Sequence, residues 1–215
     1  MDQPVSIETL HALRQLGAAT VHEAQGGKGA LDSGIKPIAA HMRLAGPAFT
    51  VDARPADNLM LHYAMLKAQP GDVLVVDAKG FLEAGVWGDV FTEQALRIGL
   101  AGLVIHGAVR DAAAMTEAGF PVFSRGLSIK GTGKHQPGRI NVTVTIGDVS
   151  INPGDIIVGD QDGVVVVQRH EVEEVLAKSR QREDKEAYFR QRIRNGATTV
   201  ELLGLEETLR RLELH

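Results

Sequence analysis

Hydrophobic residues along the chain recur either at helical spacing or in short unbroken runs, and the two patterns alternate as they do in α/β proteins. Near the start, Ser6 is placed to cap a first helix. The apolar positions of that helix, at helical spacing, are Ile7, Leu10, Leu13 and Leu16. Thr20 and Glu23 have the capping-box spacing that predicts a short second helix. A strand over residues 42–52 and a helix over 57–69 are expected to follow.

One short sequence pattern occurs twice in the chain and predicts where two core strands begin. Residues 70–77 read PGDVLVVD and residues 153–160 read PGDIIVGD, and a glycine stands three positions after each copy. Proline followed by glycine suits the two central positions of a type II turn. The apolar run after each turn is typical of a strand buried on both faces. Both copies therefore predict a tight turn that leads into a core strand.

The remaining patterns predict further helices and strands without a linker between them. The expected elements are helix 90–98 ended by Gly99, strand 102–106, helix 112–118 ended by Gly119, a strand from Phe120, an antiparallel strand over 140–149, and a long helix 171–195 ended by Gly196. No stretch rich in proline, serine or charge divides the chain. We therefore expect one α/β domain over residues 1–215, with a mixed β core, helices packed on its outside, and a helical extension over about 171–215.

Composition narrows the function mainly by exclusion. The 215 residues carry 23 Lys and Arg against 27 Asp and Glu, a net charge of −4, with no run of five or six like charges. Binding of nucleic acid through a basic surface is therefore not expected. The absence of cysteine excludes thiolate nucleophiles, disulfides and cysteine metal sites. No apolar stretch is long enough to span a bilayer and the first residues do not resemble a secretory signal, so we expect no membrane partner and a cytoplasmic protein.

The most specific local motif is HGAVRD, from His106 to Asp111, where an expected strand gives way to an expected helix. Asp111 at the helix start is placed to act as an N-cap, which is a purely structural interpretation. Arg110, at the end of the strand, projects toward the rim where α/β folds bind their ligands. The motif therefore indicates either a helix cap alone or part of a ligand site.

A second helix start complements this motif. Its residues are Gly88, Asp89, Val90 and Phe91. Unpaired backbone N–H groups at a helix start attract carboxylates, and together with the guanidinium fork of Arg110 they would clamp a small carboxylate. Asp111 could then hold a divalent cation such as Mg²⁺, which is often bound by one or two carboxylates, waters and the substrate. The eight histidines show neither H-x-H nor H-x-x-x-H spacing, so a histidine zinc site is not expected.

Two acidic residues of the long C-terminal helix, Glu183 and Glu186, fall along its apolar stripe. The stripe consists of Val172, Val175, Leu176, Phe189 and Ile193. A carboxylate in such a place is costly unless it is paired or directed to a cleft. The two acids therefore lie either on a solvated stretch of a helix that leaves the body or at a site, including one in a neighbouring subunit.

Two further features carry no chemistry in this interpretation. The glycine-rich segment 126–138 lacks the residue order of a phosphate-binding loop and does not precede a helix, so we interpret it as a mobile connection. The lysines, among them Lys67, Lys79, Lys130 and Lys134, show no sequence cue for a Schiff-base amine.

Four stretches of the chain resemble the RraA-like proteins, a family that includes class II pyruvate aldolases acting on 4-hydroxy-4-methyl-2-oxoglutarate and 4-carboxy-4-hydroxy-2-oxoadipate. They are residues 19–32 (ATVHEAQGGKGALD), 57–80, 86–111 and 151–167. The spacing of 22 positions from Gly88 to Arg110 also fits the family pattern. The resemblance implies a single-domain β/β/α sandwich of the swivelling, phosphohistidine-domain-like type, assembled as homotrimers or dimers of trimers with sites between subunits.

The resemblance also implies roles for individual residues. Gly88 through Phe91 and Arg110 would bind the pyruvate portion of a substrate, and Asp111 would anchor Mg²⁺ or Mn²⁺. In the aldolases a glutamate from the adjacent subunit's C-terminal region helps to form the site, for which Glu186 is the candidate and Glu183 the reserve. The implied reaction is aldol cleavage of a 4-hydroxy-2-oxo acid to pyruvate and a second oxo acid, with oxaloacetate decarboxylation as a side activity.

Two departures from the family pattern keep other hypotheses open. Three alanines at 112–114 follow Asp111 where aldolases tend to carry further acids, and His106 stands where an acid is common. The alternative from another class is a non-catalytic regulator of the RraA type that binds RNase E. A third hypothesis is another pyruvate-enolate lyase on the same scaffold. The long C-terminal helix that carries Glu186 favours the aldolase.

Overall fold

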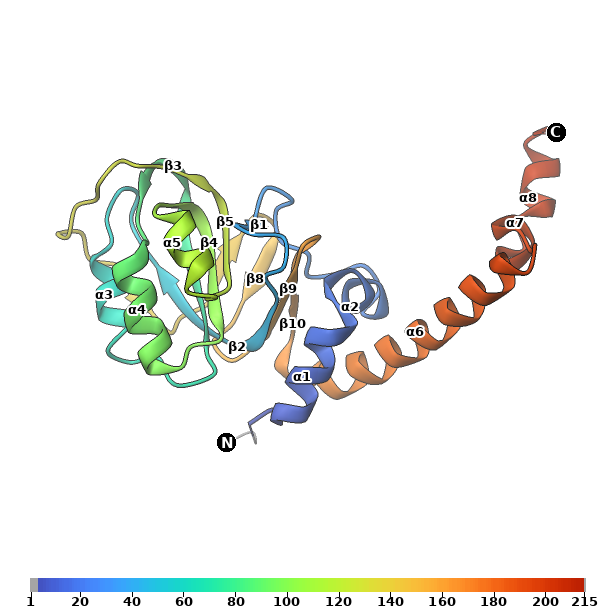
Figure 1. Ribbon diagram of the computed structural model, residues 1–215, viewed down its shortest axis with the longest axis horizontal. Helices are drawn as coiled ribbons and strands as arrows, with labels where there is room; N and C mark the ends of the chain where they lie inside the picture. Colours follow the sequence, from blue (N-terminus) through green and yellow to red (C-terminus); the bar gives the residue numbers. More distant parts are fainter. Residues whose placement is uncertain (1–3, 215) are drawn as a thin grey trace.

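A mixed β-sheet forms the centre of the structure, a computed structural model in which residues 4–214 are described (Figure 1). Within these residues the sheet has eight strands in the order β1-β5-β4-β3-β2-β9-β10, and β6 pairs with β2. The strands are β1 (Lys36–Pro37), β2 (Leu44–Asp52), β3 (Val73–Gly85), β4 (Gly102–Val109), β5 (Val122–Leu127), β6 (Arg139–Ile140), β9 (Ile156–Asp160) and β10 (Gly163–Val167), with β7 (Val144–Ile146) and β8 (Val149–Ile151) as a separate hairpin. The helices are α1 (Ile7–Leu16), α2 (Ala18–Ala24), α3 (Leu59–Ala64), α4 (Asp89–Ile98), α5 (Ala112–Glu117), α6 (Val172–Arg194), α7 (Thr199–Leu203) and α8 (Glu206–Arg211).

The four central strands, β2 to β5, run parallel and are covered on both faces, as their unbroken apolar runs require. Within β3, Leu74 and Val76 pack beneath α3, α4 and α5, whereas Val73 and Val75 pack toward the β7–β8 hairpin. All four side chains are completely buried. The two-residue period of a strand therefore divides one apolar run between two separate parts of the core.

The sheet continues antiparallel from β2 into β9 and β10, whose outer face is covered by α1, α2 and the first half of α6. Its two ends curl toward each other: Lys36 Nζ on β1 donates a hydrogen bond to the carbonyl of Asp162 beside β10, at 2.5 Å. Ala30 also bridges to Val165 of β10. The result is a mixed α/β fold with a nearly closed, barrel-like sheet, which confirms the fold class expected from the sequence.

The repeated Pro-Gly-Asp pattern forms the same turn on the two sides of β2. Gly71 and Gly154 adopt φ angles of 88° and 85°, where glycine is favoured. Asp72 and Asp155 each accept the backbone N–H of the residue three positions earlier, at 2.8 Å. The strands that follow, β3 and β9, both pair with β2, one parallel and the other antiparallel. The prediction of two equivalent turns into core strands is confirmed.

Two helices begin differently from the sequence expectation because side chains outside the helix take part. The start of α2 is Ala18 rather than the residue after a Thr20 cap, since Asp160 Oδ2 of β9 accepts the Ala18 N–H at 2.8 Å. The helix expected over 57–69 begins two residues later, because Asp57 accepts the first helical N–H at 2.9 Å. It also ends earlier, in a series of turns.

The strands differ from expectation mainly in length. β3 continues to Gly85 through an irregularity after Asp77, and β4 continues to Val109. The single strand expected over 140–149 is wrong: the segment contributes to β6, β7 and β8, with Gly147 at φ 64° turning the chain between the last two. The extended ends of β3 and β4 lead directly into α4 and α5, where the motifs of interest lie.

The long helix α6 lies close to its expected bounds, but only its first half packs on the body. Val172, Val175 and Leu176 are buried against the sheet, α1 and α2. The second half projects away from the body, and α7 and α8 follow at its tip (Figure 1). No described helix has the length and apolarity needed to cross a membrane.

Candidate functional site

Two hollows meet at Arg110, beyond the ends of β3 and β4. Backbone hydrogen bonds tie these strand ends together: Val86 donates to the Ala108 carbonyl at 3.1 Å, and Arg110 donates to the Trp87 carbonyl at 2.9 Å. These bonds place the start of α4 beside the start of α5, although 22 positions separate Gly88 from Arg110. The structure thus brings together the two helix starts that the sequence singled out.

The side chain of Arg110 is about half exposed and lines both hollows. The hollow on the α4 side, of about 220 Å³, includes Gly88, Asp89, Val90 and Phe91 in its lining. The hollow on the α5 side, of about 320 Å³, is lined by Asp111, Ala112 and residues 127–129. A guanidinium group between the two hollows can bind an anion in either of them.

Asp111 is the N-cap residue of α5, as the sequence predicted, but its side chain accepts no hydrogen bond from that helix. Its backbone is left-handed, with φ 58° and ψ 36°, a strained conformation for a residue other than glycine. Its Oδ2 atom instead lies 3.4 Å from the backbone nitrogen of Asp89 and 3.4 Å from Arg110 Nε. The strained backbone directs the carboxylate across to the start of α4.

Gly88 makes this approach possible because it has no side chain. Its backbone is extended, with φ −156°, so the conformation alone does not require glycine. A Cβ atom at this position would collide with the Asp111 carboxylate and would lie 3.2 Å from Arg110 Cγ. The glycine is therefore needed for the contact between the two helix starts.

The backbone N–H groups at the start of α4 are only partly available. The Asp89 N–H faces Asp111, and the Val90 N–H donates to Asp89 Oδ1 at 2.7 Å. Within residues 4–214 the Phe91 N–H has no acceptor. The N-terminal end of a helix carries partial positive charge, so an anion beside Arg110 would be stabilised there.

The sequence analysis missed two residues of α3 and its cap, Asn58 and His62, which line the α4-side hollow. Asn58 is only 7% exposed; its amide donates to the Val86 carbonyl at 3.2 Å, and its Oδ1 atom is buried without a donor. The His62 ring lies 4.5 Å from the Phe91 ring, and no described group hydrogen-bonds its imidazole. The spacing of four positions, in a stretch that resembles the family, was the signal that could have found them.

Lys134 also lines this hollow, on the loop that the sequence analysis treated as a mobile connection. Asp57 fixes the loop by accepting the backbone N–H groups of His135 and Gln136 at 2.8 and 3.2 Å. Burial raises the pKa of Asp57, but these bonds and the one from Leu59 outweigh it and lower the pKa. Lys134 has no ion-pair partner within the described chain, so its charge is available to a ligand.

Asp111 is the residue that the sequence singled out to hold a divalent cation. Among residues 4–214 no group of three or more histidine and acidic side chains is arranged to hold a metal ion. Asp111 nevertheless has one carboxylate oxygen at the edge of a hollow, next to the guanidinium and N–H groups that suit an anionic chelating substrate. Such a sparse set fits Mg²⁺ or Mn²⁺ with waters and substrate, and does not fit a structural zinc site.

The glutamates expected from the C-terminal helix do not reach the hollows within one chain. Glu186 lies on α6, which projects from the opposite side of the body to α4 and α5 (Figure 1). Its carboxylate pairs with Arg182 at 3.0 Å and with Arg190 at 3.4 Å. Glu183 pairs with Arg190 at 2.7 Å. Any role of Glu186 at the site requires a second chain.

His106, in the same motif as Arg110, lies away from the hollows. Its Nδ1 atom is 3.3 Å from Asp77 Oδ1, and Lys79 Nζ lies 2.6 Å from Asp77 Oδ2 and 2.6 Å from Asp52 Oδ1. These residues link paired positions on the neighbouring parallel strands β2, β3 and β4. The side chains of these residues bind one another, which indicates a structural role.

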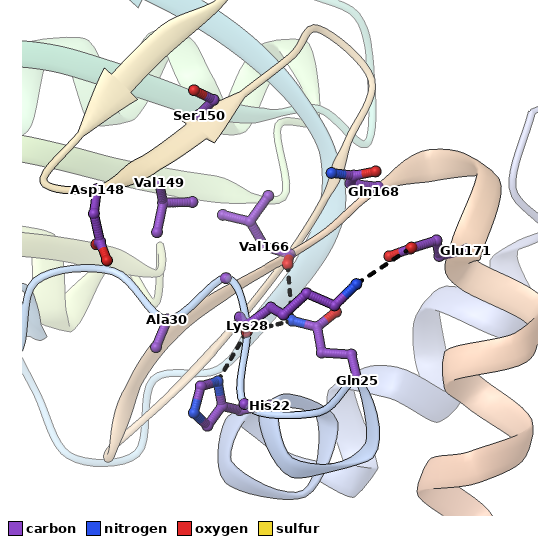
Figure 2. A pocket seen from close by; sticks show the side chains of 12 residues that line it. His22, Gln25, Lys28, Ala30, Asp148, Val149, Ser150, Val166, Gln168 and Glu171 are labelled. Carbon is purple, nitrogen blue, oxygen red and sulfur yellow. Dashed lines mark hydrogen bonds and ion pairs between the residues drawn. The ribbon is translucent and has the colours of Figure 1, made fainter.

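A larger hollow of about 500 Å³ lies elsewhere, between the glycine-rich loop after α2, the β7–β8 turn and the start of α6 (Figure 2). Four of the residues that line it bind one another: His22 Nδ1 and Gln25 Nε2 lie 2.8 and 2.6 Å from the Lys28 carbonyl, and Lys28 Nζ lies 3.4 Å from Glu171. The unpartnered groups around Arg110, rather than the size of this hollow, identify the candidate site.

Comparisons with known proteins identify the family of this chain. The model of the RraA-like family, described as Aldolase/RraA, matches residues 18–166. A protein of Halalkalibacterium halodurans named "Putative 4-hydroxy-4-methyl-2-oxoglutarate aldolase" is 40% identical over 182 residues, which cover 84% of this chain and 87% of that protein.

Solved structures show the same fold. A crystal structure of an uncharacterized protein from Pseudomonas syringae has a TM-score of 0.85 at 30% identity, covering 93% of this chain and 94% of that one. The structure of Streptomyces coelicolor RraAS2, described as an unusual member of the RNase ES inhibitor RraA protein family, has a TM-score of 0.77 at 31% identity, covering 88% and 100%. With a family match over more than half of its length, the chain belongs to the RraA-like family.

Proposed function

We propose that this protein is a divalent-metal-dependent lyase that cleaves a 4-hydroxy-2-oxo acid to pyruvate and a second oxo acid. The observation that carries the proposal is the convergence of Arg110, Asp111 and the start of α4 on one pair of hollows. The name of the Halalkalibacterium relative supports 4-hydroxy-4-methyl-2-oxoglutarate as substrate, with 4-carboxy-4-hydroxy-2-oxoadipate as a close analogue. Oxaloacetate decarboxylation is the expected side activity, because it passes through the same pyruvate enolate.

Arg110 binds the pyruvyl end of the substrate. Its guanidinium fork matches a carboxylate, and the free N–H of Phe91 at the positive end of α4 provides a further donor. Fixing the pyruvyl carboxylate and 2-oxo group aligns the C3–C4 bond before it breaks. These fixed donors also stabilise the negative charge that develops on the 2-oxo oxygen.

Asp111 holds Mg²⁺ or Mn²⁺ in this proposal. Bound there, a divalent cation supplies electrophilic stabilisation of the enolate charge. The protein's part is to hold the carboxylate in place: the left-handed backbone of Asp111 and the absence of a side chain at Gly88 direct Oδ2 toward the site. Arg110, at 3.4 Å from that oxygen, orients water that moves protons.

The distal half of the substrate lies against Asn58 and Lys134. The unpaired ammonium of Lys134 binds the second carboxylate of the substrate, and the buried, unpaired Oδ1 of Asn58 provides a hydrogen-bond acceptor on the same lining. Both named substrates carry a hydroxyl group and a second carboxylate beyond the pyruvyl portion. Asn58 and Lys134 therefore supply polar groups for the distal half of the substrate, which the three alanines at 112–114 cannot supply.

A second chain completes the site, with Glu186 as the contributed acid and Glu183 as the reserve. The projecting arm, which consists of the second half of α6 with α7 and α8, exposes large apolar side chains. The rim of the site exposes such side chains as well. On the arm these are Tyr188, Ile193, Leu203, Leu205, Leu212 and Leu214; on the rim they are Val90, Leu127 and Ile129. An arm on one side of the body and a site on the other favour head-to-tail contacts that close into a ring, here a homotrimer or a dimer of trimers.

The test is release of pyruvate, followed with lactate dehydrogenase, from oxaloacetate and from 4-hydroxy-4-methyl-2-oxoglutarate with Mg²⁺ or Mn²⁺. We expect turnover that EDTA abolishes and that Arg110→Ala reduces by at least about 100-fold. Arg110→Lys keeps the charge without the fork and should recover only part of the rate. Pyruvate formation that is independent of metal, or equal in Arg110→Ala, would contradict the proposal.

A non-catalytic regulator that binds RNase E is the second candidate. It is favoured by the likeness to Streptomyces RraAS2, a member of an RNase ES inhibitor family, and by the alanines at 112–114. A binding measurement with purified RNase E beside the pyruvate assay separates the two functions. Tight binding to RNase E without metal-dependent pyruvate release would support the regulatory function and contradict the lyase function.

A further inference from the structure

His62 is the residue of the α4-side hollow that the proposed function leaves without a role. Its ring packs at 4.5 Å from the ring of Phe91, and its backbone N–H donates to the Asn58 carbonyl at 3.2 Å. These contacts hold the side chain at the hollow that Arg110 also lines. Among residues 4–214 no donor or acceptor binds either imidazole nitrogen. The side chain is exposed apart from its packing on Phe91, and an imidazole with both nitrogens available beside a substrate clamp is suited to proton transfer.

The other charged groups that face this hollow are poorly suited to accept a proton. Arg110 and Lys134 are cations without a lone pair, and Asp89 Oδ1 already accepts the Val90 N–H at 2.7 Å. Asp57, in the loop before α3, is occupied by three backbone N–H groups. Desolvation, and then the charge of Lys134, lower the pKa of His62, which favours the neutral imidazole that can act as a base.

We propose that His62 is the general base of the cleavage and takes the proton of the substrate's 4-hydroxyl group. The inference rests on the proposed function, because the clamp at Arg110 sets the orientation of the substrate. His62 and Arg110 line the same hollow of about 220 Å³, so a substrate held at Arg110 by its pyruvyl end shares that hollow with the imidazole of His62.

The hydroxyl proton passes to an imidazole nitrogen of His62, C4 becomes the carbonyl of the second oxo acid, and the C3–C4 bond breaks. The electron pair of that bond moves into the pyruvate enolate, which takes a proton from water at C3. His62 then returns its proton to solvent. Glu186, which pairs with two arginines on α6, is the alternative residue for accepting this proton.

Two reactions of the same site need no proton from a 4-hydroxyl group. Oxaloacetate decarboxylation and exchange of the pyruvate methyl protons with D₂O both pass through the enolate, and both need Arg110 and Asp111. Neither substrate has a 4-hydroxyl group. Loss of His62 should therefore impair aldol cleavage selectively, whereas a general disruption of the site would impair all three reactions.

The experiment compares His62→Asn with Glu186→Gln and with His11→Asn, an exposed control on α1, in the full-length protein. Each variant is assayed for cleavage of 4-hydroxy-4-methyl-2-oxoglutarate, for oxaloacetate decarboxylation, and for pyruvate methyl exchange by NMR. For His62→Asn we expect kcat of cleavage to fall by about 100-fold or more, with the other two rates changed less than threefold. The His11→Asn variant should match the parent in all three.

Two additional readouts distinguish a base from a structural residue. Added imidazole should restore part of the cleavage rate of His62→Ala, and the acid limb in the pH profile of kcat/KM for cleavage should be lost in that variant. Equal losses in all three reactions, unchanged cleavage in His62→Asn, or a selective loss of cleavage in Glu186→Gln alone would each overturn the assignment to His62. If the parent protein performs none of the three reactions, the proposed function fails first and this inference with it.

Discussion

Asp111 and Gly88 are in direct contact across two helix starts: the Asp111 carboxylate occupies the space that a side chain at position 88 would fill. The contact depends on a left-handed backbone at one residue and on a missing Cβ at the other. Strained non-glycine residues tend to occur at functional sites, where the surrounding fold holds them in place. This contact explains why the two sequence motifs belong to one site.

Gly88→Ala should therefore abolish metal-dependent pyruvate release while the protein stays folded. The added methyl group displaces the Asp111 carboxylate, and we expect a loss of at least about 100-fold in kcat/KM, since small displacements of catalytic groups have effects of this size. The matched control is Gly131→Ala, because a Cβ there meets no atom within 4 Å and the residue does not have positive φ. Equal activities of the two variants would show that the Asp111–Gly88 contact has no catalytic importance.

Asp111→Asn should remove the response to metal with little change in intrinsic stability. Asparagine tolerates the left-handed backbone better than most residues, so the fold is preserved. In the parent, Mg²⁺ with pyruvate should raise the unfolding temperature in a concentration-dependent way, by about 2.7 kcal/mol of stability at 100 times the Kd. Thermal unfolding with Mg²⁺ and pyruvate, against EDTA, measures this. A shift of equal size in Asp111→Asn would place the cation elsewhere.

The sequence predicted those parts of the fold that depend on local chemistry. The Ser6 cap is confirmed, since its side chain accepts the Thr9 N–H at 3.0 Å, and the end of α4 at a left-handed Gly99 is confirmed as well. The start of α2 could not be predicted, because its cap is Asp160, distant in sequence. Likewise, the extension of β3 to Gly85 follows from pairing with β4 and not from its own pattern.

The candidate site shows the same division between local and distant contributions. The two helix starts at Gly88 and Arg110 carry recognisable motifs. The position of Lys134, in contrast, depends on a loop that Asp57 holds through backbone hydrogen bonds. Asn58 could not be identified as a site residue from its own position in the sequence, because its importance lies in an Oδ1 atom that is buried without a donor. That property arises only when α3, the α4-side hollow and the loop come together.

Lys134→Met should weaken binding of substrates with a distal carboxylate more than binding of pyruvate. The ammonium has no partner in the described chain, so its removal costs a charge pair with substrate and little stability. We expect KM for 4-hydroxy-4-methyl-2-oxoglutarate to rise about tenfold, as for loss of a charge-assisted hydrogen bond. The inhibition constant for pyruvate should stay the same. Lys130→Met, which removes an exposed partner of Glu83, is the control and should change neither value.

Asp57→Asn should destabilise the protein at neutral pH and not in acid. The backbone N–H groups of His135, Leu59 and Gln136 hold the pKa of Asp57 below its usual value in spite of burial. A carboxyl group whose pKa is lower in the folded than in the unfolded protein stabilises the fold at pH values above its unfolded pKa, near 4. This stabilisation is lost as the pH falls through the pKa of the folded state. We expect a loss of about 1–3 kcal/mol at pH 7 that shrinks below about pH 4, from urea unfolding. Asp148→Asn, an exposed control, should show neither effect.

Mixing two inactive variants should restore activity if Glu186 of one chain completes the site of another. Arg110→Ala lacks the clamp and Glu186→Gln lacks the contributed acid, so each alone should be nearly inactive. In a ring assembled at random from equal amounts, a site is intact when one chain supplies Arg110 and its neighbour supplies Glu186, which gives about one quarter of the sites. We therefore expect about a quarter of the parent activity after co-refolding, measured as pyruvate release. Activity no higher than the mean of the separate variants would show that each site is built from a single chain.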